Sequence, residues 1–193
     1  EPGGSVRVDD TTSVGRIFSG RLSYAKGAMV LHMLRWVCGD DAFFGGVRSY
    51  LHDPALAYGY ARTGDLKQHL ETASGKNLDG FFADWFYGEG YPTYQVDWSK
   101  SPSNVVSVKL GQTQSHPSVG FYEMPVQVKL SDGISDTTVV LNHGYSGQVF
   151  TLPLDFSPST LVFDPNLWII SRNNFVQELS ATGEPKPPYA LEI

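Results

Sequence analysis

The pattern of apolar positions changes character near the middle of the chain. Between residues 22 and 86, apolar side chains recur every three to four positions, which is the spacing of a buried helical stripe. After Pro92, apolar and polar residues alternate, as in half-buried strands of an antiparallel sheet. The sequence therefore predicts a helical first half and a strand-rich second half.

Four helices are predicted in the first half, and their ends coincide with residues that favour helix termini. Gly39 suits the C-terminus of the first helix, and Asp40 or Asp41 can cap the second. Pro54 ends the second helix, and the run 88–92 breaks the fourth. The predicted helices cover residues 22–37, 40–51, 63–74 and 77–86, with the start of the last at Asn77 or Asp79.

The second half contains short alternating segments separated by turn-forming residues. Their number and spacing favour a small antiparallel β-sandwich. The Pro-rich run 184–188 then predicts an extended tail or linker over 173–193. The predicted strands are 94–98, 106–110, 126–130, 137–142, 148–152, 160–163 and 168–171.

Composition and charge limit the function classes. The chain has 193 residues, of which 41% are hydrophobic and 18% are charged, as in ordinary globular proteins. A net charge of −6 argues against a nucleic-acid partner, and no apolar run is long enough for a membrane span. The lone Cys38 excludes an internal disulfide and is interpreted as a small buried filler. The compartment stays open; the Pro-rich tail and the scarcity of cysteine favour a secreted or periplasmic location.

Metal-binding patterns are missing from the sequence. The histidines at 32, 52, 69, 116 and 143 are never four positions apart, the spacing at which two imidazoles on one helix grip zinc. No His-Glu pair occurs, and the aspartates suit helix caps and turns better than a calcium loop. On the strand half, one aromatic set forms either core or a stacking face for a sugar or peptide: Tyr94, Trp98, Tyr122 and Tyr145.

The segment 23–34, Ser-Tyr-Ala-Lys-Gly-Ala-Met-Val-Leu-His-Met-Leu, carries the strongest functional signal. It resembles the tyrosine-bearing helix of zinc aminopeptidases of the aminopeptidase N type, the gluzincin metallopeptidases, which contain a Tyr-x-Lys-Gly-Ala run. Further similarities follow in the family's order. They are Gly39–Phe44 with 47–51, Ala61–Leu66, 73–78 with 81–85, and Gly90-Tyr91-Pro92.

The resemblance implies an α+β multidomain fold and a parent enzyme. Residues 1–92 would be the helical C-terminal part of a thermolysin-like catalytic domain, 93–172 a β-sandwich domain and 173–193 a tail. The parent would be a zinc-dependent aminopeptidase acting on peptide substrates. Its zinc ligands, a His-Glu-x-x-His helix and a later glutamate, would lie upstream of Glu1. This fragment alone would then hold no zinc and be inactive, and would expose apolar surface shaped to pack on the missing N-terminal catalytic portion.

The resemblance assigns a catalytic role to Tyr24, whose phenol would donate to the oxyanion formed during peptide-bond hydrolysis. Spacing alone also allows a tyrosine packed at a helix start with its hydroxyl in water. Lys26 is interpreted as a solvated or salt-bridged side chain, or as a group near the site. An alternative function is a non-catalytic protein-interaction module in which the β-sandwich provides the binding face.

Overall fold

The computed structural model describes residues 3–180, 183–184 and 186. The chain divides after Gly90 into two compact units, Glu1–Gly90 and Tyr91–Ile193, called here the helical unit and the sheet unit. Within the described residues every helix lies in the first unit and every strand in the second. The expected mixture of helices and sheet is thus confirmed.

The helical unit contains the four predicted helices and departs from them in two ways. A short additional helix, α1, precedes them, and π-helical turns form the start of the first predicted helix and the end of the last. The apolar spacing does not reveal where a π-helical turn replaces an α-helical one, because a single wide turn adds only one residue to a pattern that is read over several turns. The elements are α1 Val14–Ile17, η1 (π) Gly20–Lys26, α2 Gly27–Cys38, α3 Asp40–Leu51, α4 Thr63–Ser74, α5 Asp79–Phe82 and η2 (π) Ala83–Tyr87.

The boundary between α2 and α3 corrects one expectation. Gly39, with φ 83°, ends α2 and occupies the N-cap position of α3, so neither aspartate caps that helix. Asp40 instead lies in the first turn of α3, where a carboxylate is favoured by the helix dipole. It accepts hydrogen bonds from the Arg35 guanidinium at 2.8 and 2.7 Å, and Arg35 holds the pKa of this carboxyl below its usual range.

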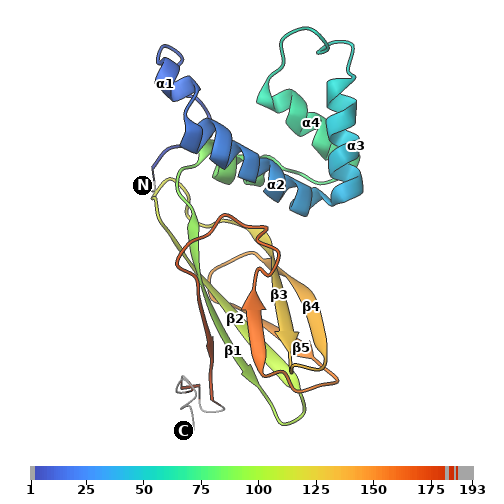
Figure 1. Ribbon diagram of the computed structural model, residues 1–193, viewed down its shortest axis with the longest axis vertical. Coiled ribbons are helices and arrows are strands. Elements are labelled where there is room, and N and C mark those ends of the chain that lie inside the picture. Colours follow the sequence, from blue (N-terminus) through green and yellow to red (C-terminus); the bar gives the residue numbers. More distant parts are fainter. Residues whose placement is uncertain (1–2, 181–182, 185, 187–193) are drawn as a thin grey trace. The chain divides into compact units, whose positions relative to one another are not determined.

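Helices α3 and α4 pack directly against each other and are joined by the loop 52–62 (Figure 1). Gly46 of α3 lies against Leu70 of α4, which is fully buried. A polar contact reinforces this pair. The His69 ring lies between two groups of the α3 end, with Nδ1 3.0 Å from the Ser49 hydroxyl and Nε2 3.1 Å from the Asp53 carboxylate. The core of the helical unit includes Met33, Leu34, Leu70, Leu78, Phe82 and Trp85.

Several large apolar side chains of the helical unit remain exposed. One group lies elsewhere in the unit, namely Leu51, Tyr58, Tyr60 and Tyr87, and the other lies on the first predicted helix and on the segments directly before and after it. This is the region in which the sequence predicts surface shaped for another part of a larger protein. The exposed residues there are Val14, Phe18, Tyr24, Leu31 and Phe44.

The sheet unit contains two sheets, with strand orders β5-β2-β1-β7 and β4-β3-β6. Neighbouring strands are antiparallel except β1 and β7, and β1 and β2 form a long hairpin (Figure 1). The strands are β1 Pro92–Lys100, β2 Val105–Gln114, β3 Met124–Ser131, β4 Asp136–His143, β5 Gln148–Pro153, β6 Thr160–Phe163 and β7 Phe175–Glu178.

Six of the seven predicted strands are confirmed, and the seventh is wrong. Residues 168–171 form no strand, because the Asp164 carboxylate accepts the backbone N–H groups of Trp168 and Ile169 and holds the start of this segment in an irregular conformation. The last strand is instead β7, which lies within the region expected to be tail. Most of the Pro-rich run 184–188 lies outside the described residues.

The buried faces of the two sheets meet each other. The Tyr94 ring of β1 lies 4.8 Å, centroid to centroid, from the Phe163 ring of β6, and His143 Nε2 of β4 lies 3.1 Å from the Leu110 carbonyl oxygen of β2. Of the four aromatic residues considered for a stacking face, only Tyr145 is exposed. The rings of Tyr94, Trp98 and Tyr122 are buried, so these four residues form no stacking face.

Among the described residues, no helix has the length and apolar character that a membrane span requires.

A matched pair of glycines in α3 tests the packing of α3 on α4. A Cβ at Gly46 would lie 3.0 Å from Leu70 Cδ2 and 3.1 Å from the His69 carbonyl oxygen, whereas a Cβ at Gly45 would meet nothing within 4 Å. We expect Gly46→Ala to destabilise the protein by about 1–3 kcal/mol through overpacking. Gly45→Ala should stabilise it by about 0.5–1 kcal/mol. Urea unfolding followed by circular dichroism measures both, and shifts of the same sign would contradict this packing.

Burial of His143 makes the stability of the sheet unit depend on pH. The side chain is fully buried, and burial lowers its pKa from 6.5 more than its backbone hydrogen bonds raise it. Below pH 6.5 the unfolded chain therefore binds this proton before the folded chain does, so stability should fall as the pH drops from 6.5 towards the lowered pKa.

The variants His143→Gln and His116→Gln distinguish this effect from general acid sensitivity. Urea unfolding between about pH 5 and pH 8 should show a shallower loss of stability with acid in His143→Gln, because the buried ring no longer has to be protonated. His116→Gln retains the buried ring and should keep the slope of the parent. Equal slopes for the two variants would show that His143 does not cause the acid sensitivity.

Candidate active site

Tyr24 lies in a wide helical turn. The Ser19 carbonyl accepts the N–H groups of both Ser23, at 2.9 Å, and Tyr24, at 3.2 Å, so this oxygen makes an α-type and a π-type hydrogen bond together. The Ser19 hydroxyl also accepts the Leu22 N–H at 3.2 Å and caps the turn. π-Helical turns are rare and occur often at functional sites. The turn η1 continues directly into α2, which provides a rigid support.

The Tyr24 side chain projects from this turn towards solvent. Its exposure is 59%, whereas Tyr94 in the core of the sheet unit is fully buried. Among the described residues, the Tyr24 phenol has no hydrogen-bond partner. The ring is therefore mostly exposed rather than packed, and its hydroxyl remains available as a donor.

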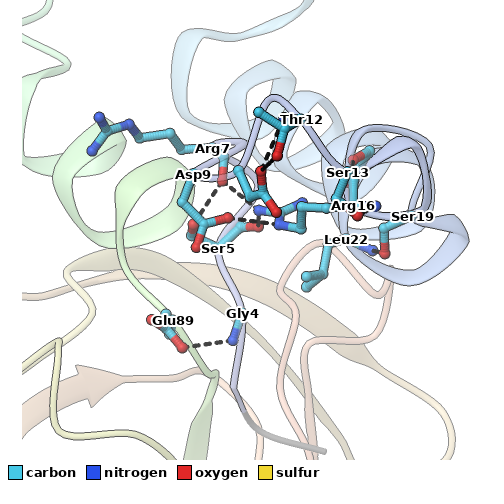
Figure 2. A network of polar contacts seen from close by, with 12 residues as sticks. Gly4, Ser5, Arg7, Asp9, Thr12, Ser13, Arg16, Ser19, Leu22 and Glu89 are labelled. Atoms are coloured by element: carbon cyan, nitrogen blue, oxygen red, sulfur yellow. Dashed lines mark hydrogen bonds and ion pairs between the residues drawn. The ribbon is translucent and has the colours of Figure 1, made fainter.

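Arg16 organises the segment that precedes the turn (Figure 2). Its Nε donates to the Asp9 carboxylate at 2.8 Å, and its Nη2 donates to the carbonyl oxygens of Ser5, at 3.0 Å, and Arg7. The hydrogen bond from Arg16 holds the pKa of Asp9 below its usual range. Because Ser23 Oγ donates to the Arg16 carbonyl at 3.4 Å, this network extends to the residue next to Tyr24.

The Lys26 amino group makes hydrogen bonds to backbone groups within the helical unit. Nζ donates to the carbonyl oxygens of Gly4 and Gly88, both at 3.3 Å. The Gly4 N–H in turn donates to the Glu89 carboxylate at 2.6 Å (Figure 2). Burial lowers the pKa of the Lys26 ammonium, and the nearby Glu89 charge partly opposes that shift. Lys26 is therefore neither fully solvated nor directly hydrogen-bonded to a carboxylate; it joins three segments of the backbone.

The histidines are distributed through the fold without converging. His69 lies between α3 and α4, and His143 lies in the core of the sheet unit. Over residues 3–180, 183–184 and 186, no three His, Cys, Asp or Glu side chains are placed to hold a metal ion together. The described residues alone therefore do not fit a catalytic zinc.

The sequence profile described as the Peptidase family M1 domain matches residues 3–85, which include η1, Tyr24 and Lys26. Residues 3–85 are therefore similar to the peptidase M1 family, and they are called the M1 segment below. The resemblance to aminopeptidase N-type enzymes seen in the sequence is thereby confirmed, and the M1 segment coincides with most of the helical unit.

Curated relatives extend the similarity into the sheet unit. The chain is 31% identical over 140 residues to an alanine/arginine aminopeptidase of Saccharomyces cerevisiae, an alignment covering 71% of this chain and 16% of that protein. It is 29% identical over 133 residues to aminopeptidase N of Lactococcus lactis, covering 68% of this chain and 15% of that protein. The chain thus spans only about a sixth of the length of these relatives.

A solved structure shows the same fold. The crystal structure of Legionella pneumophila aminopeptidase A in complex with aspartic acid superposes with a TM-score of 0.65 over 81% of this chain and 18% of that chain, at 18% sequence identity. At this identity the match concerns the fold alone. Because it covers 81% of the chain, it includes residues beyond the M1 segment.

Sequence reasoning identified Tyr24 and Lys26 but missed the residues that surround them. Gly4, Ser19 and Glu89 hold the turn and its neighbours through hydrogen bonds that each join a backbone group to a side chain. The only sequence signals were the Gly3-Gly4 pair and the run Gly88-Glu89-Gly90, which indicate tight backbone but give no partner. The helical unit therefore contains a structured support around Tyr24 that no local motif describes.

Proposed function

We propose that this chain is part of a zinc-dependent aminopeptidase that hydrolyses N-terminal peptide bonds, and that it supplies the oxyanion-stabilising Tyr24. One observation carries the proposal: within the M1 segment, an exposed phenol with no hydrogen-bond partner among the described residues lies on a well-supported helical turn. On this proposal the helical unit is the C-terminal part of a thermolysin-like catalytic domain, and the sheet unit is the β-sandwich domain that follows it.

The chemistry requires a donor of this kind. When a nucleophile adds to the carbonyl carbon of a peptide bond, negative charge develops on the carbonyl oxygen. A preorganised neutral donor within about 2.7–3.1 Å of that oxygen stabilises the transition state more than the bound substrate. A phenol that is already bonded inside the protein would have to break that bond first. Tyr24 has no such bond within the described chain and can donate without that rearrangement.

Zinc would supply the activated water and polarise the carbonyl group. Its ligands would belong to a preceding catalytic portion, which also forms the rest of the peptide-binding site. Tyr24 would contribute a hydrogen bond and no metal coordination. The alternative is a non-catalytic interaction module in which the sheet unit provides the binding face; the exposed phenol within the M1 segment favours the catalytic proposal over it.

Replacement of Tyr24 by phenylalanine tests the assignment in the full-length polypeptide that carries these residues. Tyr24→Phe removes one hydroxyl from an exposed ring, so folding and zinc content should not change. Loss of one oxyanion donor should lower kcat by about 100-fold to 1000-fold, with little change in KM, because the bond forms only in the transition state. Steady-state hydrolysis of an aminoacyl chromogenic substrate measures both constants.

Tyr60→Phe is the matched control, since Tyr60 is an exposed tyrosine of the same unit outside η1. It loses the same hydroxyl and should keep the turnover of the parent. If kcat of Tyr24→Phe stays within about threefold of the parent at equal zinc content, the catalytic role assigned to this tyrosine is wrong. A fall in kcat shared equally by both variants would point to a general loss of integrity.

A further inference from the structure

We propose that Lys26 is a positioning residue for Tyr24, and that it acts through a closed ring of hydrogen bonds with Gly4 and the segment Gly88–Glu89. This inference rests on the proposed function, because it assigns Lys26 a role in the reaction through Tyr24. The claim that this ring stabilises the turn concerns the described chain alone, and it can be tested by a measurement that does not depend on enzyme activity.

The ring connects three segments that are far apart in the sequence. Lys26 Nζ reaches the carbonyl oxygens of Gly4 and Gly88, and the N–H of Gly4 reaches the carboxylate of Glu89. Gly4 thus uses both of its backbone polar groups, and the covalent bond between Gly88 and Glu89 closes the ring. Removal of the ammonium group would open two of its three hydrogen bonds.

Residues of η1 make further contacts with the N-terminal segment Gly3–Gly4. Gly4 has φ +100°, and a Cβ at this position would lie 2.5 Å from Leu22 Cδ1, so its backbone rests directly on that side chain. Leu22 belongs to η1 and is buried, and Arg21 Nη1 donates to the Gly3 carbonyl at 2.9 Å. The side chains of Arg21, Leu22 and Lys26 therefore all lie against Gly3–Gly4.

This support matters because the Tyr24 side chain makes no contacts of its own among the described residues that would fix the position of its hydroxyl. Its phenol has no hydrogen-bond partner in the described chain, and its ring is mostly exposed. The position of the ring therefore depends on the backbone of η1, which Ser19 holds at the start and Lys26 holds at the end. A misplacement of about 1 Å at a reacting group can reduce the rate by about 100-fold.

The direction of the Lys26 side chain separates a positioning role from a catalytic one. Its amino group points inward to two backbone carbonyls, whereas the Tyr24 ring two residues earlier is exposed. A charged donor to carbonyl oxygens in a half-buried place makes a strong hydrogen bond, and its loss leaves those oxygens unpaired. Lys26 should therefore influence the reaction only by way of the turn.

A double-mutant cycle in the full-length polypeptide tests the coupling between the two residues. Lys26→Met keeps most of the aliphatic stem and removes the charge; we expect kcat to fall about tenfold to 100-fold with KM changed less than about threefold. In the Tyr24→Phe background the same change should cost less than about threefold, because the donor it positions is already absent. Lys26→Arg keeps a charged donor and should recover part of the rate.

Lys76→Met is the matched control. The Lys76 amino group also donates to a backbone carbonyl, that of Val37, in the same unit but away from η1. This variant should keep the parent kcat. Equal losses from Lys26→Met in the parent and in the Tyr24→Phe background would overturn the positioning role, and so would a Lys76→Met loss of the same size.

Amide hydrogen exchange of the 193-residue chain tests the ring independently of activity. Lys26→Met should speed exchange of the Tyr24 and Leu22 amides at least about tenfold, while Lys76→Met leaves them unchanged. If Lys26→Met fails to fold, Glu89→Gln weakens the ring more gently and should speed the same amides. Unchanged exchange in a folded variant would overturn the inference. If Lys26→Met speeds exchange of these amides but Tyr24→Phe keeps the turnover of the parent, the hydrogen-bonded ring would be supported as the structural support of the turn. That combination would contradict only the proposed catalytic function of Tyr24.

Discussion

The two hydrogen bonds accepted by the Ser19 carbonyl are the interaction on which the tyrosine-bearing segment depends. With a single i to i+4 bond the backbone would begin an ordinary α-helix at this point. The second bond, from the Tyr24 N–H, widens the turn and sets the direction in which the following residues leave it. The contacts of Arg21, Leu22 and Lys26 with the N-terminal segment are then made from the face that this wide turn creates.

Local rules predicted most of the element positions. Helices α3 and α4 follow from apolar spacing bounded by Gly39, Pro54 and Gly75, and strands β1 to β3 follow from strict alternation. These features depend on residues close together in the sequence, and there the local preferences agree with the final structure. The exposed Tyr24 was found only because a short motif resembled a known family.

The features that sequence analysis missed depend on distant partners. The strand expected at 168–171 is replaced by an irregular segment because the Asp164 carboxylate accepts hydrogen bonds from two backbone amides, which alternation in that segment cannot reveal. Strand β7 forms because β1 offers it a parallel edge. Inside the sheet unit, the buried Gln112 side chain bonds both the N–H and the carbonyl of Tyr122, at 2.8 and 3.0 Å, so a polar residue occupies a core position that a hydrophobic pattern would assign to an apolar one.

The wide turn at residues 20–26 also has a consequence for the phase of the helix that follows it. One residue more than an α-helical turn separates Ser19 from its second partner, and each residue of an α-helix corresponds to a rotation of about 100°. The apolar face of α2, with Met33 and Leu34, is therefore turned relative to the face that carries Tyr24. A regular helix through the same residues would set the phenol at a different angle to the core. The wide turn thus lets the segment bury the apolar face of α2 and still direct the Tyr24 ring towards solvent.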